Sequence, residues 1–361
     1  MRKFILAVLS MAIALQCLAA PADDSAVTIY GVVDAFVQVL DSGSHLSRVR
    51  SGGLVGSRLG FKGSEDLGHG LKSFFALESG MNIDDGAINQ SNTFFGRLSQ
   101  VGLSGAFGTV SLGRQYSSLY AATTEMSIFT NAASGPSTVL IGGFGGGYEP
   151  VRGASASAIP PAAGATGNGS PLRVNNSLRY ESPNYEGVKA SLLYGAGELA
   201  GRTSHSRIVD LGLRYTYDGL DVIASMVSDH ASVGGMSDAT RAQTRTLAAA
   251  QSFDAVRIVA GYLDFKDLRA AGQDGRGAWL GAEYRLGTQP RYDAENKTQA
   301  LGFGWVYDLS RRSAVYSSLT RFKNDDRAGP DGVGRFNGAV PDGLTAPGDR
   351  SITELALGLR H

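Results

Sequence analysis

Five histidines are the residues of this sequence whose type could carry acid–base or metal chemistry. They are His45, His69, His205, His230 and His361. None is spaced from another histidine as metal ligands are, and no thiol follows Cys17, so no zinc site is expected. Ser204-His205 and Asp229-His230 resemble parts of a hydrolase triad by adjacency only. Most of these histidines fall in predicted turns or loops, so we predict no catalytic residue, no metal site and no cofactor.

The glycine-rich segment 142–147 is the other feature that could bind a ligand. A phosphate-binding loop needs a Lys-Ser/Thr pair and a helix directly after its glycines, because backbone N–H groups and the lysine together hold the phosphates. Neither follows here, so the segment is predicted to be a loop.

The N-terminus predicts export from the cytoplasm. Arg2 and Lys3 precede an apolar run over 4–15 and the small residues 19–22. This order is typical of a secretory signal peptide, and the run is too short for a membrane-spanning helix. We predict a signal peptide over 1–22 and a mature domain over 23–361. Cys17 lies within the predicted signal peptide. Lipidation of this cysteine is not expected, because it requires a small residue directly before the cysteine and Gln16 stands there.

Composition indicates a membrane barrel. Lys and Arg total 33, as do Asp and Glu, and removal of Arg2 and Lys3 leaves 31 against 33. This balance argues against a general nucleic-acid binder. Glycine accounts for 49 of 361 residues, roughly twice the usual share. Mean hydropathy is −0.06, as in a barrel whose lipid-facing and lumen-facing residues alternate.

Period-2 alternation is visible along the chain. The apolar face of the first segment carries Val27, Ile29, Gly31, Val33, Ala35, Val37 and Val39. Similar alternation occurs near 173–180, 211–217, 279–286 and 301–307, with charge and glycine together on the second face. Aromatic residues collect near the ends of the apolar face, as in outer-membrane barrels. A secreted β-sandwich or β-solenoid is the alternative.

Short and long connections also alternate. Tight turns are predicted at 66–70, 105–108, 183–187, 218–219 and 308–312. Longer polar loops are predicted around 41–52, 82–92, 198–206, 229–241, 266–276 and 324–350. The connection 118–170 is the longest, and a structureless segment of this length is functional or disordered.

Several segments, taken in order, resemble the Gram-negative general porins of the β-proteobacterial and neisserial type. The matching segments are 27–35, 57–68, 101–105, 108–110, 112–116, 175–177, 180–183, 309–312 and 358–361. Each segment is weak evidence alone, but their order covers nearly the whole mature chain.

The resemblance implies an all-β transmembrane antiparallel barrel of sixteen strands that assembles as a homotrimer. It also implies that the long third loop, here 118–170, folds into the lumen and narrows the pore. The expected partners are outer-membrane lipid and lipopolysaccharide, the outer-membrane assembly machinery, and small hydrophilic solutes and ions, with no nucleic acid.

The resemblance further places a basic strip at the pore constriction. By motif, three arginines fall at Arg58, Arg97 and Arg173. Alternation independently sets Arg58 and Lys62 opposite Leu59, on the inward face. Arg173 shares its predicted face with Asn175 and Ser177.

Simple parity gives Arg97 the face of Val101, so a bulge between them is expected. The constriction loop contributes two acids, Glu125 and Glu149. Cations lining a pore favour anions through their local field. We therefore predict passive diffusion of ions and small hydrophilic solutes across the outer membrane, with a weak preference for anions.

Two departures from the family pattern leave alternatives open. Relatives continue past the final Arg-His to a terminal Phe, whereas this sequence stops at His361, which predicts slow assembly. Only ten residues, 288–297, stand where relatives fit a turn, a strand and a loop. Pro290 makes them a poor strand. Residues 288–297 therefore form either a short strained strand or a gap in the barrel of a damaged porin copy. The alternative function is accordingly a non-conducting barrel with a structural or adhesive role, or an assembly-impaired porin copy.

Overall fold

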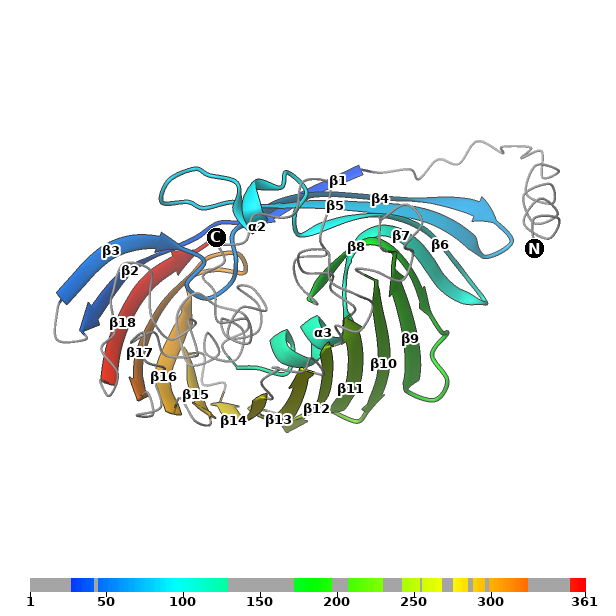
Figure 1. The fold of residues 1–361 in the computed structure, drawn as a ribbon. Coiled ribbons are helices and arrows are strands. Elements are labelled where there is room, and N and C mark those ends of the chain that lie inside the picture. Colours follow the sequence, from blue (N-terminus) through cyan, green and yellow to red (C-terminus); the bar gives the residue numbers. More distant parts are fainter. Residues whose placement is uncertain are drawn as a thin grey trace.

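The computed structural model describes residues 27–41, 45–128, 172–196, 207–229, 242–253, 255–267, 275–284, 288–295, 299–323 and 351–361. Within these ranges the chain is mostly antiparallel β-strand, curved as Figure 1 shows. The strands are β1 (Val27–Val32), β2 (Asp34–Asp41), β3 (His45–Ser51), β4 (Arg58–Gly68), β5 (Leu71–Gly80), β6 (Leu98–Gly105), β7 (Gly108–Tyr116), β8 (Arg173–Glu181), β9 (Val188–Gly195), β10 (Ile208–Tyr217), β11 (Leu220–Asp229), β12 (Ala242–Phe253), β13 (Val256–Asp267), β14 (Gly275–Tyr284), β15 (Thr288–Glu295), β16 (Gln299–Asp308), β17 (Ala314–Lys323) and β18 (Ser351–Arg360). The described helices are α2 (Asn89–Asn92) and α3 (Ser118–Thr124). Among the described residues, neither helix has the length and apolar content needed to cross a membrane.

Most strands pair with the next strand along the chain. Each strand from β4 to β17 is hydrogen-bonded to the next one along the chain. β18 pairs with β2, β2 with β3, and β1 with β4. Only Val33 separates β1 from β2, and it exchanges two backbone hydrogen bonds of 2.8 Å with His361. The first and last parts of the described chain therefore lie side by side.

The predicted tight turns are confirmed. β4 and β5, β6 and β7, β8 and β9, β10 and β11, and β16 and β17 are joined at the five places expected. In the β10–β11 connection, Asp218 and Gly219 have φ of 43° and 77°. Two successive residues with positive φ are typical of a type I′ hairpin turn, whose twist matches that of the strands.

Two sequence predictions need correction or resolution. The segment 41–52, predicted as a polar loop, contains β3, because 45–51 pair residue by residue with β2. The uncertain stretch 288–297 contains β15, paired with both β14 and β16. Of the two alternatives for this stretch, the strand is confirmed. Pro290 is accommodated opposite Trp305.

The alternation of side chains is confirmed by exposure. Ile29, Leu213 and Leu357 are 67%, 51% and 57% exposed, whereas Asp34, Asp210 and Ala356 are buried. We call the face with exposed apolar side chains the outer face and the opposite one the inner face. An outer face of this kind suits lipid rather than water.

Helix α3 packs on the inner face. It contacts β10, β11 and β12, and it lies inside the curve of the sheet in Figure 1. Its Leu119 and Ala122 join a buried cluster with Ile208, Ile223 and Val227 of these strands. The start of the predicted loop 118–170 therefore lies against the inner wall, while 129–170 lie outside the described residues.

Candidate functional site

Glu78, near the end of β5, is the carboxylate around which the predicted basic residues gather. The Nε atom of Arg97 lies 2.5 Å from its Oε1, and the Nε atom of Arg58 lies 3.5 Å from its Oε2. Two phenols donate hydrogen bonds to the same carboxylate, Tyr30 at 3.1 Å and Tyr116 at 3.2 Å. Burial of this group makes its charge-assisted hydrogen bonds stronger than they would be in water.

The strand register explains this meeting of charges. Arg58 stands opposite Gly80 of β5, and Leu98 of β6 stands opposite Glu78. The strand on one side of β5 therefore supplies Arg58, and the residue directly before the strand on its other side is Arg97. Arg97 itself lies in a bend before β6, and β6 pairs with β5 and β7 without a register shift. The predicted bulge after Arg97 is wrong: strand parity does not apply to a residue outside the strand.

The charge of Arg97 is retained despite its burial. Burial by itself lowers the pKa of this guanidinium. Nearby Tyr116 and Glu78 raise the pKa by more than burial lowers it, so the pKa of Arg97 lies above its ordinary value. Arg97 is therefore positively charged at neutral pH.

Arg173, the first residue of β8, contacts two stacked tyrosines. Its guanidinium carbon lies 5.1 Å from the ring centre of Tyr116 and 5.3 Å from that of Tyr120. The two rings are 4.0 Å apart. Tyr120 belongs to α3, so the cation–π contact joins the wall to the inner helix. Tyr116 also donates a hydrogen bond to Glu78, so Arg173 is connected through Tyr116 to the carboxylate that Arg58 and Arg97 contact. Lys62 is connected to the same carboxylate through Tyr30, since its Nζ lies 5.4 Å from the centre of the Tyr30 ring.

We call Arg58, Lys62, Arg97 and Arg173 the basic strip. Alternation misplaced one neighbour of this strip. Strict alternation over 173–180 would turn Val174 outward and keep Arg173 on the face of Ser177, but Val174 and Ser177 are both buried on the inner side, Val174 within the α3 cluster. The predicted common face of Arg173 and Ser177 is therefore wrong. The reason is a register shift between β7 and β8 at Gly113/Gln115, which reverses the parity of β8.

Sequence reasoning did not single out Arg114 or Glu78 as site residues. Arg114 donates from Nε to the carbonyl of Gly96 at 2.7 Å and from Nη1 to the side chain of Asn175. It lies close enough to Arg173 for their charges to interact. Glu78 could have been suspected as a lone carboxylate after the apolar stretch 74–77, but its partners depend on strand register.

Glu125 pairs with the wall rather than with the basic strip. Its Oε2 lies 2.8 Å from Nη1 of Arg214 in β10, and its backbone carbonyl accepts a 2.7 Å hydrogen bond from Arg257 in β13. Trp279 of β14 donates a 2.7 Å hydrogen bond to the carbonyl of Met126. These contacts fix the C-terminal end of α3. Glu149 lies outside the described residues.

The N-terminal end of α3 is held by Asp210 of β10. This buried carboxylate accepts a 2.7 Å hydrogen bond from the backbone N–H of Ser118 and another from its hydroxyl. Ser225 of β11 lies 2.7 Å from the same hydroxyl. The close approach requires glycine at 212, because a Cβ there would lie 2.6 Å from Cβ of Ser118.

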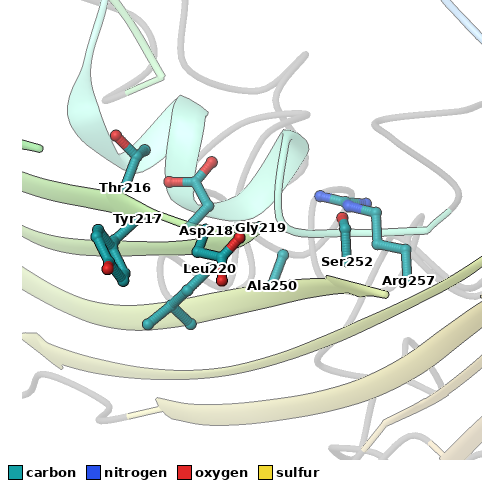
Figure 2. A pocket seen from close by; sticks show the side chains of 9 residues that line it. Thr216, Tyr217, Asp218, Gly219, Leu220, Ala250, Ser252 and Arg257 are labelled. Carbon is teal, nitrogen blue, oxygen red and sulfur yellow. The ribbon is translucent and has the colours of Figure 1, made fainter. Parts of the chain in front are cut away.

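Among the described residues, two of the cavities lie near the short connections that follow β8 and β10. One is drawn in Figure 2, has a volume of about 430 Å³, and is lined by Thr216, Tyr217, Asp218, Gly219, Leu220, Asp221, Ala250, Ser252 and Arg257. The other, of about 320 Å³, lies between α3 and strands β8 to β10. Thr216 lines both.

The described histidines are peripheral to these features. His45 is exposed, with Nδ1 3.8 Å from Asp41, and exposed His361 lies 2.8 Å from the hydroxyl of Ser313. Within the described ranges, no three His, Cys, Asp or Glu side chains group as metal ligands. His205 and His230 lie outside these ranges.

Comparison with known sequences identifies the family, because residues 6–327 match the family described as Gram-negative porin. The chain belongs to the Gram-negative porins. It is 30% identical to outer membrane porin protein 32 of Delftia acidovorans, over 93% of this chain and 94% of that one. It is also 30% identical to major outer membrane protein P.IB of Neisseria gonorrhoeae, over 58% and 53% of the two chains.

A solved porin structure has the same fold. The anion-selective porin from Comamonas acidovorans aligns with a TM-score of 0.70 and 28% identity, covering 94% of this porin and 99% of that chain. The predicted antiparallel porin fold, the outer-membrane location and passive diffusion as the function are thereby confirmed.

Proposed function

We propose that this porin conducts small anions in preference to cations, and that the basic strip sets this preference. The observation that carries the proposal is that the four cations of the strip outnumber the carboxylates in contact with them. Within the described part of the chain, Glu78 is the carboxylate in contact with the strip, and it faces two of its arginines. Arg114 adds a further cation beside Arg173.

Local charge of this kind acts on ions through the field it creates in a narrow passage. The net charge of the whole chain has little effect on this local field, because charges farther away than about 10 Å are screened at 0.1 M salt. The solved relative with 28% identity is named as an anion-selective porin, which supports the same preference here.

The proposed architecture is a closed barrel of sixteen strands, assembled as a homotrimer. The pairings support it, since β1 and β2 are interrupted only at Val33, and β3 and β4 only at 52–57. Counting each interrupted pair as one strand reduces the 18 described strands to 16. Closure leaves no unpaired strand edge in lipid. The remaining proposals are a signal peptide over 1–22, a mature domain over 23–361, and a constriction loop over 118–170 that includes Glu149.

We further propose that the protein is not an enzyme and uses no cofactor. Its partners would be outer-membrane lipid, lipopolysaccharide and the assembly machinery, besides permeating solutes. Membership of a channel family supports the absence of catalysis.

Conductance in a planar bilayer tests this function. We expect ohmic steps from the detergent-folded protein, and a reversal potential in a dilute KCl gradient that indicates chloride preference. A cation preference contradicts the role of the basic strip. Folded protein that gives no steps supports instead a structural or adhesive barrel. A single-subunit mass in detergent, measured by light scattering, contradicts the homotrimer.

A further inference from the structure

The smaller cavity near α3 contains ionic groups that the basic strip does not use. It has a volume of about 320 Å³ and is bounded by Ser118 and Ala121 of α3 and by the wall of β8 to β10. Its charged lining residues are Arg179, Glu181, Lys189 and Arg214. This volume is at the small end of the range of small-molecule sites, which favours a small solute.

Both arginines of this cavity are already occupied. Arg179 donates from Nη1 to the carbonyl of Tyr116 at 2.7 Å and from Nη2 to Oε1 of Glu181 at 2.8 Å. Arg214 donates from Nε to Asp221 at 2.9 Å and from Nη1 to Glu125 at 2.8 Å. Neither guanidinium is therefore a ready site for an added anion.

Lys189 and Glu181 retain binding capacity. Lys189 is exposed and forms no ion pair or hydrogen bond with the residues that the structure describes. Glu181 uses Oε1 for Arg179, and its Oε2 has no bond to described residues. Asn184 uses its Oδ1 for the N–H of Gly187 at 2.8 Å, which leaves its amide donors for a ligand.

The strand register sets the separation between Lys189 and Glu181. Glu181 of β8 stands opposite Ser191 of β9, and Lys189 lies two residues from Ser191. Residues two apart in a strand share a face, and such diagonal neighbours are roughly 7–8 Å apart at Cα. The pair is thus close enough to hold one small solute between them, yet it forms no direct ion pair.

The charge of this region is balanced, unlike that of the basic strip. Arg179, Lys189 and Arg214 are offset by Glu181 and by the two carboxylates bound to Arg214. A balanced site gives a simple anion little advantage. A molecule with one charge of each sign can bind Lys189 and Oε2 of Glu181 at once.

We propose that this cavity binds zwitterionic solutes of amino-acid size as they pass through the pore. The solute carboxylate bonds Lys189 and the amide of Asn184, and its ammonium group bonds Oε2 of Glu181. The site rests on the proposed function, since solutes must enter the lumen to reach it. It adds a solute class that net anion preference does not predict.

The test measures reduction of ion current by L-alanine in planar bilayers containing the full porin. Propionate, which lacks the ammonium group, and ethylammonium, which lacks the carboxylate, serve as matched probes. We expect L-alanine to reduce the current at lower concentration than either. Lys189→Met and Glu181→Gln should each raise the half-blocking concentration of L-alanine about fivefold or more.

The matched probes separate the two contacts. Propionate block should weaken only with Lys189→Met, and ethylammonium block only with Glu181→Gln. Lys72→Met, which removes an exposed lysine of β5 outside the cavity, should leave all three values unchanged. Equal block by L-alanine in wild type and both variants overturns the site, as does stronger block by propionate than by L-alanine.

A second measurement keeps this result separate from the proposed function. Saturation-transfer NMR on the folded protein detects L-alanine binding without any need for conductance. Binding that Lys189→Met and Glu181→Gln abolish supports the site even if reversal potentials contradict anion preference. Normal anion-preferring steps without L-alanine binding overturn the site alone.

Discussion

The Nε atom of Arg97 lies 2.5 Å from Oε1 of Glu78, and both side chains are less than a tenth exposed. A buried ion pair of this kind is costly to break, because the remaining partner is left charged without its counterion. It also lowers the net charge that the strip presents to permeating ions. Glu78 therefore combines a structural role with an effect on selectivity.

Replacement of this carboxylate should separate the two roles. Glu78→Gln leaves the shape but removes the negative charge, so anion preference in dilute KCl should increase while the protein loses about 3–5 kcal/mol of stability. Reversal potential and the midpoint of thermal unfolding in detergent measure the two effects. Glu65→Gln, at an exposed position of β4, is the control. An unchanged reversal potential in Glu78→Gln would mean that this carboxylate lies outside the ion path.

Removal of two cations should have the opposite effect. The double variant Arg58→Ala, Arg173→Ala is expected to shift the reversal potential toward zero or toward cation preference. The shift should be largest at low salt, where screening is weakest. Arg245→Ala is the control, since this exposed arginine shares the outer face with Leu247. A double variant with the selectivity of wild type would contradict the proposed function of the strip.

Alternation predicted most of the fold because lipid and lumen impose opposite requirements on successive residues. It worked where strands are regular, as in 211–217 and 301–307. It was wrong at Val174, where a register shift reverses parity, and at Arg97, which precedes its strand. The segment 45–51 was missed because its polar residues resemble a loop until its pairing with β2 is known.

The candidate site was only partly predictable for a related reason. Family motifs indicated the four cations of the basic strip. The contacts that join them involve Tyr30, Glu78 and Tyr116 from three different strands. Which of these side chains meet depends on register and on distances between strands, and no local sequence pattern encodes either.

Asp34 of β2 should be important for stability rather than for conduction. Its buried carboxylate accepts hydrogen bonds of 3.0 Å from the backbone N–H groups of Gly53, Leu54 and Val55, and a further one from the hydroxyl of Tyr316. Asp34→Ala leaves several buried donors unpaired, so we expect a loss of more than about 2 kcal/mol.

Unfolding in guanidinium chloride with the protein in detergent measures this loss. Asp66→Ala is the matched control, because that exposed carboxylate accepts one backbone N–H, from Gly68 at 2.9 Å, and should change stability little. Equal destabilisation by the two variants would show that the contacts of Asp34 contribute no more than an exposed turn.

Asp210 should control the position of α3, because it accepts both the backbone N–H and the hydroxyl of Ser118. In Asp210→Asn an amide group replaces one of these acceptors and confronts a donor. We expect α3 to move more freely against β10, which should increase open-channel current noise by severalfold and lower the thermal midpoint by a few degrees. Asp308→Asn, at a half-exposed carboxylate that lies 3.9 Å from Arg360, should change neither quantity. If the noise of Asp210→Asn equals that of Asp308→Asn, the contacts of Glu125 and Met126 at the other end of α3 are sufficient to hold it.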